Sequence, residues 1–216
     1  MVKGLSFLDK VLCSVDNFLK TSVGSLDGTG RENPAGSSLK HCDSQQAEKL
    51  EKAGNLMRVN HSGEVAAQGL YQGQLFFENN AAIVDYLRHA AKEEADHLRW
   101  TEEYLRFASS RKSYLNPLWY WGGFSLGLYM QQRGPEKSKS FLAETERQVQ
   151  NHLKKQIDLY AEDNLKARDI LNKMYEDEGL HADWAETNLE KHELTFKEKF
   201  LMKIFSKVMV IVSEKV

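Results

Sequence analysis

The stretches "KEEADHLRW" (residues 92–100) and "YEDEGLHADW" (residues 175–184) each contain a glutamate followed three positions later by a histidine. The two pairs are Glu94 with His97 and Glu178 with His181. Both stretches have helical patterns, and residues three apart on a helix lie on one face, about 5 Å apart along the axis. A carboxylate and an imidazole placed in this way can bind the same metal ion. One pair alone is weak evidence, because the chain has seven histidines and many glutamates.

A further glutamate precedes each pair by about the same distance. Glu64, in "VNHSGEVAAQGLY", lies 30 residues before Glu94, and Glu146, in "LAETERQVQNHL", lies 32 residues before Glu178. This separation fits a helix, a turn and part of a returning helix, so each glutamate can face its pair across a helical hairpin. Two such hairpins would bring together four carboxylates and two imidazoles, the ligand set of ferritin-like di-iron and di-manganese carboxylate proteins. Two divalent ions would balance four buried negative charges that are otherwise costly.

Three neighbouring residues leave alternatives open. Glu144 is a rival to Glu146, since both lie in "AETER". His152, six residues after Glu146, is either an outer contact of the metal site or the substrate, or an exposed helical histidine. His61, three residues before Glu64, either holds the Glu64 carboxylate or lies on the surface.

The composition favours an all-α protein with one main body. The 216-residue chain is 41% hydrophobic and 28% charged, so a sizeable core can be buried, and its three prolines suit long helices. No segment shows a convincing strand pattern. The net charge of −2 gives no reason to expect a nucleic-acid partner. The two cysteines form no CxxC pair, which excludes a rubredoxin-type module and fits a reducing, intracellular setting.

The apolar periodicity predicts a series of helices. They are expected at residues 3–20, 44–78, 81–109, 114–130, 138–163, 165–190 and 195–216. Residues 21–40 are rich in glycine and serine and are expected to form a linker or long loop. The predicted division is therefore an N-terminal amphipathic helix plus linker (1–43) and a ferritin-like four-helix bundle with additional amphipathic and hydrophobic helices (44–216). Four glycines in the second helix indicate close helix packing: Gly54, Gly63, Gly69 and Gly73.

Two segments suggest contact with a membrane surface. Residues 114–130 are apolar, aromatic and uncharged, and they form either a buried helix or a helix that meets lipid. Residues 195–216 carry apolar residues on one side and lysines on the other, so this helix packs on the bundle, rests on an anionic membrane, or does both. No apolar run of about eighteen residues occurs, so no segment clearly spans a bilayer.

Several motifs together resemble the Coq7 family of demethoxyubiquinone hydroxylases. They are "RVNHSGEVAAQGLYQGQ" (58–74), "EEADH" (93–97), the Glu146 to His152 spacing, "QID" (156–158) and "DEGLHAD" (177–183). The resemblance covers about residues 45–216, and the N-terminal helix and linker are similar to an extension of bacterial members. Leu153 departs from the aromatic residue of the short eukaryotic forms.

The resemblance implies metal ligands at Glu64, Glu94, His97, Glu146, Glu178 and His181, holding two iron ions per chain. It implies hydroxylation, with O2, of the ring of a polyprenyl methoxy-methyl-benzoquinol (demethoxyubiquinol) late in ubiquinone biosynthesis. Such a substrate lies in the bilayer, so peripheral association with the cytoplasmic side of the inner (cell) membrane is expected. Homo-oligomers or contacts with other ubiquinone-biosynthesis proteins are compatible with this assignment.

The sequence is also compatible with other functions. The alternative is another ferritin-like di-iron oxidase, such as a ferroxidase or peroxidase, and manganese is not excluded by the ligand types. A lipid-binding helical bundle without iron is the non-enzyme alternative. No convincing nucleotide-binding loop is present, so the electron donor is not identified by the sequence.

Overall fold

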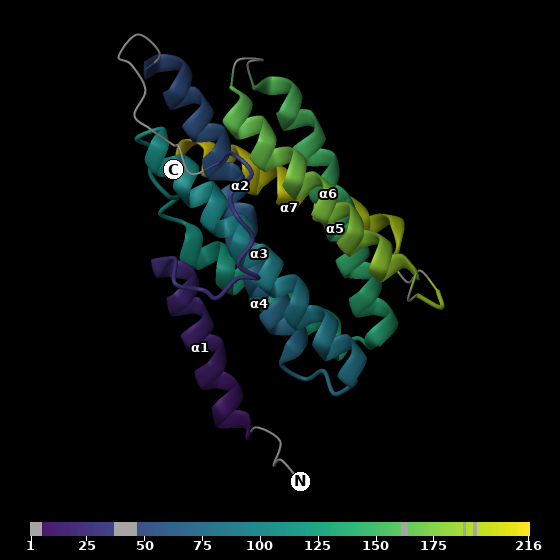
Figure 1. Cartoon of the computed structure of the whole chain (residues 1–216). Helices are drawn as coiled ribbons and strands as arrows, with labels where there is room; N and C mark the ends of the chain where they lie inside the picture. Colours follow the sequence, from purple (N-terminus) through teal and green to yellow (C-terminus); the bar gives the residue numbers. More distant parts are fainter. Residues whose placement is uncertain (1–5, 37–46, 161–163, 188, 192–193) are drawn as a thin grey trace.

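The computed structural model describes residues 6–36, 47–160, 164–187, 189–191 and 194–216. These residues form seven helices and no strand, which confirms the all-α prediction (Figure 1). The helices are α1 (Phe7–Val23), α2 (Ala47–Leu75), α3 (Ala81–Phe107), α4 (Asn116–Gln132), α5 (Pro135–Leu159), α6 (Leu165–Thr187) and α7 (Phe196–Lys215).

Two helical hairpins, α2–α3 and α5–α6, form the four-helix bundle. Their helices run roughly along one direction, whereas α7 crosses the bundle at an angle (Figure 1). Five residues separate α2 from α3, and the last of them, Asn80, caps α3 by accepting hydrogen bonds from two backbone N–H groups. α5 begins at Pro135, three residues earlier than expected, because proline has the backbone angle of a first helical turn.

Two hydrophobic clusters of the core lie one toward each end of the bundle, and a smaller third cluster contains Val65, Leu98 and Tyr120. Of the two at the ends, one is built around Trp100, Tyr104 and Leu171, and the other around Leu70, Leu87 and Leu142. The six candidate ligands fall between these clusters along all four bundle helices. The site is therefore sealed by apolar side chains at both ends.

The glycines of α2 and α4 explain how α4 attaches to the bundle. A Cβ atom on Gly69 would lie 2.0 Å from the carbonyl oxygen of Tyr120, and one on Gly123 would lie 2.2 Å from that of Ala66. The two backbones therefore touch directly, and close packing is confirmed for Gly69, as it is for Gly73 on Phe124. A Cβ on Gly54 would meet the side chain of Ser110 at 2.7 Å, whereas one on Gly63 would meet nothing within 4 Å, so packing does not explain that glycine.

Three helices, α1, α4 and α7, each present three or more large apolar side chains to solvent. On α7 the side that faces outward is the apolar one, whereas Met202 and Ser213 are turned inward. Lys137 on α5 pairs with Glu198 at 2.7 Å and holds the start of α7 in this orientation. The exposed apolar residues of the three helices include Leu8, Leu12 and Leu19 on α1, Leu118 and Leu126 on α4, and Phe200, Leu201, Phe205 and Val208 on α7. Among the described residues, no helix combines the length and hydrophobicity needed to cross a membrane.

The segment after α1 is packed on the bundle rather than free of it. The backbone N–H of Thr29 donates a hydrogen bond of 3.1 Å to the Asp96 carboxylate of α3, and the side-chain amide of Asn33 donates one of 2.7 Å to Glu103. The predicted domain division at residue 43 falls within residues 37–46, outside the described residues, and stays a prediction.

Candidate metal centre

The structure brings all six candidate ligands together in the middle of the bundle. They form two overlapping groups in which the potential ligand atoms lie within 4.8 Å of one another. The first group is Glu64, Glu94, His97 and Glu178, and the second is Glu94, Glu146, Glu178 and His181. Every one of these side chains is buried.

Each hairpin supplies three of the candidate ligands. Glu64 of α2 and the Glu94–His97 pair of α3 serve the first group, whereas Glu146 of α5 and the Glu178–His181 pair of α6 serve the second. Glu94 and Glu178 belong to both groups. Their carboxylates therefore lie where each could bridge two ions, and the other four side chains each lie at one end.

Several ligand atoms have no other partner among the described residues. Glu94 Oε1, Glu178 Oε2 and His181 Nδ1 are buried and make no hydrogen bond. Glu94 Oε1 and His181 Nδ1 lie 3.1 Å apart without the geometry of a hydrogen bond. Unsatisfied buried polar atoms are costly, and cations at their common focus would satisfy them.

Each histidine is oriented by an acidic residue of the opposite hairpin. His97 Nε2 lies 3.0 Å from Asp177, and His181 Nε2 lies 2.9 Å from Glu93. A carboxylate at Nε2 holds the proton there and leaves Nδ1 free to bind a metal ion. Glu93 and Asp177 were missed in the sequence, although each directly precedes the glutamate of its Glu-x-x-His motif.

Tyr71 is a further missed residue. Its hydroxyl donates a hydrogen bond of 2.8 Å to Glu146 Oε1, and its side chain is fully buried. Burial and the nearby Glu146 carboxylate raise the pKa of Tyr71 well above its usual value, so the phenol stays protonated and remains a donor. Tyr71 therefore fixes one oxygen of Glu146 and leaves the other for the centre.

The electrostatics of the cluster show crowding of negative charge. Burial, followed by the Glu94 charge, raises the pKa of Glu64 well above its usual value. Burial, followed by Glu178, does the same for Glu146. Burial would also raise the pKa of Glu94, but the close approach of the His181 and His97 imidazoles outweighs it and lowers that pKa.

The pKa values of the two histidines are raised by the same carboxylates. Burial lowers the pKa of His97, but its contacts with Asp177, Glu178 and other carboxylates outweigh this effect and raise the pKa well above its usual value. His181 behaves in the same way through Glu178, Glu93 and Glu94. In the metal-free protein, protons thus balance part of the charge that divalent ions would neutralise. The donor set of carboxylates and imidazoles fits iron or manganese.

The structure shows where Glu144, His61 and His152 lie relative to the cluster. Glu144 points away from the cluster and pairs with Lys199 of α7 at 3.0 Å, so Glu146 is the cluster member of the two. Neither alternative for His61 is correct, because it is buried and its Nδ1 accepts a hydrogen bond of 3.3 Å from Asn116. His152 is partly buried, its buried Nε2 has no described partner, and its role as an outer contact stays a prediction.

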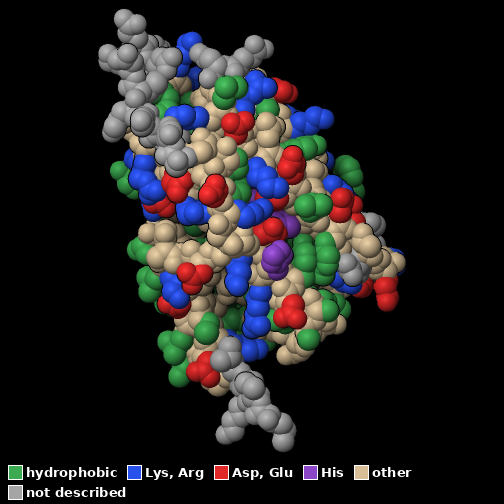
Figure 2. All heavy atoms as spheres, viewed as in Figure 1, with side chains coloured by type: hydrophobic (Ala, Val, Ile, Leu, Met, Phe, Trp, Pro, Cys, Tyr) green, Lys and Arg blue, Asp and Glu red, His purple; other side chains and the backbone are tan. Residues whose placement is uncertain are grey.

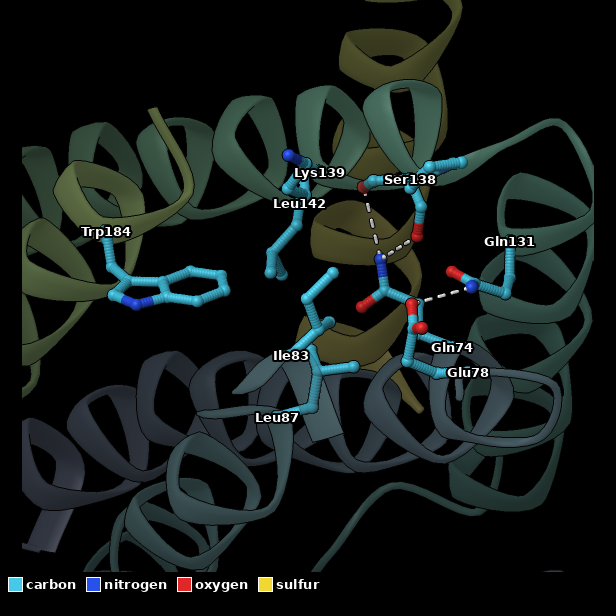
Figure 3. Close-up of a pocket in the computed structure, with 10 residues that line it drawn as sticks. Gln74, Glu78, Ile83, Leu87, Gln131, Ser138, Lys139, Leu142 and Trp184 are labelled. Atoms are coloured by element: carbon cyan, nitrogen blue, oxygen red, sulfur yellow. Dashed lines mark hydrogen bonds between the residues drawn. The ribbon is translucent and has the colours of Figure 1, made fainter. Parts of the chain in front are cut away.

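A narrow pocket lies near the centre, between α2, α3 and α5. It is too narrow for more than about one water molecule. Apolar side chains form one part of its lining, and polar ones form the rest: Gln74, Glu78, Gln131, Ser138 and Lys139. Figure 3 shows Gln74 hydrogen-bonded to Ser138, with Trp184, Leu142 and Leu87 around the opening. Trp184 is three residues after His181, and Leu142 is four before Glu146, so the pocket is about one helical turn from the centre.

Comparisons with known proteins agree with the motifs. The family model for ubiquinone biosynthesis protein COQ7 matches residues 51–213. A protein of Dechloromonas aromatica (strain RCB) named 3-demethoxyubiquinol 3-hydroxylase is 44% identical over 201 residues, which cover 93% of this chain and 95% of that protein. Proteins of the same name from Chromobacterium violaceum and Nitrosococcus oceani are 41% and 40% identical, covering 94% and 95% of this chain and 96% and 94% of the relatives. The family resemblance is thereby confirmed, and the chain belongs to the COQ7 family of ubiquinone biosynthesis proteins.

Proposed function

We propose that this chain is a 3-demethoxyubiquinol 3-hydroxylase, which adds a hydroxyl group from O2 to the ring of a polyprenyl methoxy-methyl-benzoquinol. The observation that carries this proposal is the buried cluster of four carboxylates and two imidazoles, in a chain whose relatives bear that name. One oxygen atom of O2 enters the ring and the other leaves as water. The reaction therefore needs two electrons and two protons from a reductant.

The proposed cofactor is a pair of iron ions. Glu64 and His97 would hold one ion, Glu146 and His181 the other, and Glu94 and Glu178 would be shared. When bound and reduced, such an iron pair supplies O2 activation. Four carboxylates balance the four positive charges of two ferrous ions.

The surrounding residues of the chain orient and protect this centre. Asp177 and Glu93 keep a proton on Nε2 of the two histidines, so that Nδ1 faces the centre. Tyr71 restrains Glu146. The hydrophobic clusters at both ends limit water, which strengthens electrostatic interactions inside the site. The quinol ring is proposed to approach beside Trp184 and Leu142, whose side chains would have to move apart to admit it, because the pocket there is too narrow for a ring.

The proposed place of action is the cytoplasmic side of the inner membrane, with the protein bound peripherally. The support is the outward apolar side of α7, together with those of α1 and α4. Lysines lie along one flank of α7, where they would meet anionic headgroups. The face shown in Figure 2 instead mixes acidic and basic side chains, with histidines gathered at one place near its middle.

The test of this function uses the full chain loaded anaerobically with Fe(II). A demethoxyubiquinol analogue and 18O2 are added, and the product is examined by mass spectrometry. The proposal expects a hydroxylated ring carrying one 18O atom, and no product from Glu178→Ala. Oxidised iron without hydroxylated quinol would instead favour the ferroxidase or peroxidase alternative.

A further inference from the structure

The segment between α1 and α2 carries an arginine that reaches the surroundings of the metal centre. Residues 25–36 run along α3 in the structure (purple trace after α1, Figure 1). The segment approaches α3 closely at Gly28, where a Cβ atom would lie 2.2 Å from Asp96 Oδ1. The Thr29 hydroxyl also donates to Asp96. These contacts fix the position of Arg31, two residues further along.

Arg31 contacts three acidic residues with one guanidinium group. Its Nη1 lies 2.6 Å from Asp177 Oδ2 and 3.5 Å from Glu93 Oε1. Its Nε donates a hydrogen bond of 3.2 Å to Asp96 Oδ2. The guanidinium also lies over the ring of Trp100, 5.1 Å from its centroid. Asp96 and Asp177 are almost fully buried, with side chains 1% and 3% exposed.

Two of these three acids are the ones that orient the histidines. Asp177 Oδ2, the atom held by Arg31, is also the atom 3.0 Å from His97 Nε2. Glu93 contacts Arg31 through Oε1 and His181 through Oε2. A single nitrogen of Arg31 therefore lies between the hydrogen-bond partners of both imidazoles.

We propose that Arg31 is a positioning residue of the metal centre, which fixes Asp177 and Glu93 and thereby both histidines. Its positive charge also offsets part of the negative charge that these two acids present to the imidazoles. Other cations near them are more peripheral: Lys173 contacts the opposite oxygen of Asp177 at 2.9 Å, and the exposed His89 lies 3.7 Å from Glu93. Arg31 lies outside residues 51–213, the part matched by the family model.

The physical consequence concerns the electron density at the iron ions. An acid without its arginine draws more strongly on the imidazole N–H, which makes that imidazole a stronger donor to the metal. Stronger donors and a lost positive charge both stabilise the ferric state. Removing Arg31 should therefore lower the midpoint potential of the iron pair and slow its reduction.

Arg99 offers a matched control within the same contact area. It is the same residue type and pairs with Asp96 at 3.0 Å, but neither Asp177 nor Glu93 is among its described partners. It also donates to the backbone carbonyl of Arg31, so it contributes to holding the segment. A purely structural role for the segment predicts similar effects of Arg99→Gln and Arg31→Gln, whereas positioning through Arg31 predicts different ones.

The experiment measures the midpoint potential of the iron pair by mediated redox titration of the iron-loaded full chain. The expected result is a lower potential in Arg31→Gln, an unchanged potential in Arg99→Gln, and an intermediate value in Arg31→Lys, because an ammonium group reaches one acid at a time. Equal potentials in Arg31→Gln and Arg99→Gln would overturn the inference. If Arg31→Gln does not fold, a wild-type potential in Arg31→Lys would overturn it.

This inference rests on the proposed metal centre, and different results would refute the centre and the role of Arg31. A wild-type chain that binds no iron would refute the centre and the role of Arg31 together. A wild-type iron pair whose potential ignores Arg31 would refute only the positioning role.

Discussion

Glu94 of α3 and Glu178 of α6 each supply a ligand atom to both groups of the candidate metal centre, although they lie 84 residues apart in the chain. Each is also the first residue of a Glu-x-x-His motif. Buried carboxylates of the two hairpins therefore face one another here. Two divalent ions shared by these carboxylates would hold the hairpins together.

Metal content should follow membership in the two groups. Glu64 belongs to one group, so Glu64→Ala should lower the iron content from about two ions per chain to about one. Glu178 belongs to both, so Glu178→Ala should lower it further. Glu144→Ala is the control, because Glu144 pairs with Lys199 outside the cluster. The number of iron ions per folded chain is measured by inductively coupled plasma mass spectrometry. An equal loss of iron in Glu64→Ala and Glu144→Ala would contradict the assignment.

Metal binding should release protons. In the metal-free protein, burial and neighbouring acids raise the pKa of Glu64 and Glu146, and hydrogen bonds to acids outweigh burial and raise those of His97 and His181. Metal ions must displace these protons, so affinity for Mn(II) should weaken as the pH falls. Calorimetry in buffers of different ionisation enthalpy counts the protons released. An affinity independent of pH would contradict this account of the site.

Two adjacent glycines of α4 should behave oppositely. Gly123→Ala places a methyl group against the Ala66 carbonyl and should lower the free energy of unfolding by about 1–3 kcal/mol. Gly122→Ala meets nothing within 4 Å and should raise it by about 0.5–1 kcal/mol, since alanine favours helix. Urea unfolding of the metal-free variants checks both values. Similar effects at the two positions would show that the α2–α4 contact is looser than described.

His61 should make the protein less stable in acid. Burial, followed by the charge of Lys112, lowers the pKa of His61 from 6.5 to about 3. The unfolded chain therefore takes up a proton that the folded protein refuses, and stability present above pH 6.5 is lost as the pH falls toward 3. The slope attributable to this one group is at most about 1.4 kcal/mol per pH unit. His61→Asn keeps an acceptor for Asn116 but cannot titrate, so its urea-unfolding free energy should fall less steeply with pH than the wild type's. Parallel slopes would contradict the assignment.

Membrane binding should depend on the outward side of α7. Phe200 and Phe205 are 55% and 67% exposed, so replacing both with serine should leave the bundle folded. Each buried phenylalanine contributes about 1.5–3 kcal/mol, so binding to anionic liposomes should weaken at least about tenfold in co-sedimentation. Leu180→Ser on α6 is the control, because Leu180 is 64% exposed on a different helix. If the double variant and the control bind alike, α7 is not the membrane contact.

The bundle and the six clustered residues could be predicted because their signals are local. Helical periodicity and two Glu-x-x-His motifs, each preceded by a glutamate at about thirty residues, specify which side chains face one another. The pairs Glu93–His181 and Asp177–His97 were missed, although the acid before each motif is a local signal that could have been used.

Other features depend on long-range contacts that no local pattern encodes. Arg31 stands in a segment whose glycines and serines are typical of a linker, yet it contacts Asp177, 146 residues away. His61 is buried with Asn116 of α4 as its hydrogen-bond partner, and the helical pattern around Glu64 does not show this contact. The orientation of α7 also depends on a distant contact, between Lys137 and Glu198.

The most direct test of the metal centre is anomalous X-ray diffraction, at the iron edge, from crystals of the iron-loaded protein. The account predicts two anomalous peaks in the bundle, one among Glu64, Glu94, His97 and Glu178 and the other among Glu94, Glu146, Glu178 and His181. A single peak, or peaks outside these two groups, would contradict it.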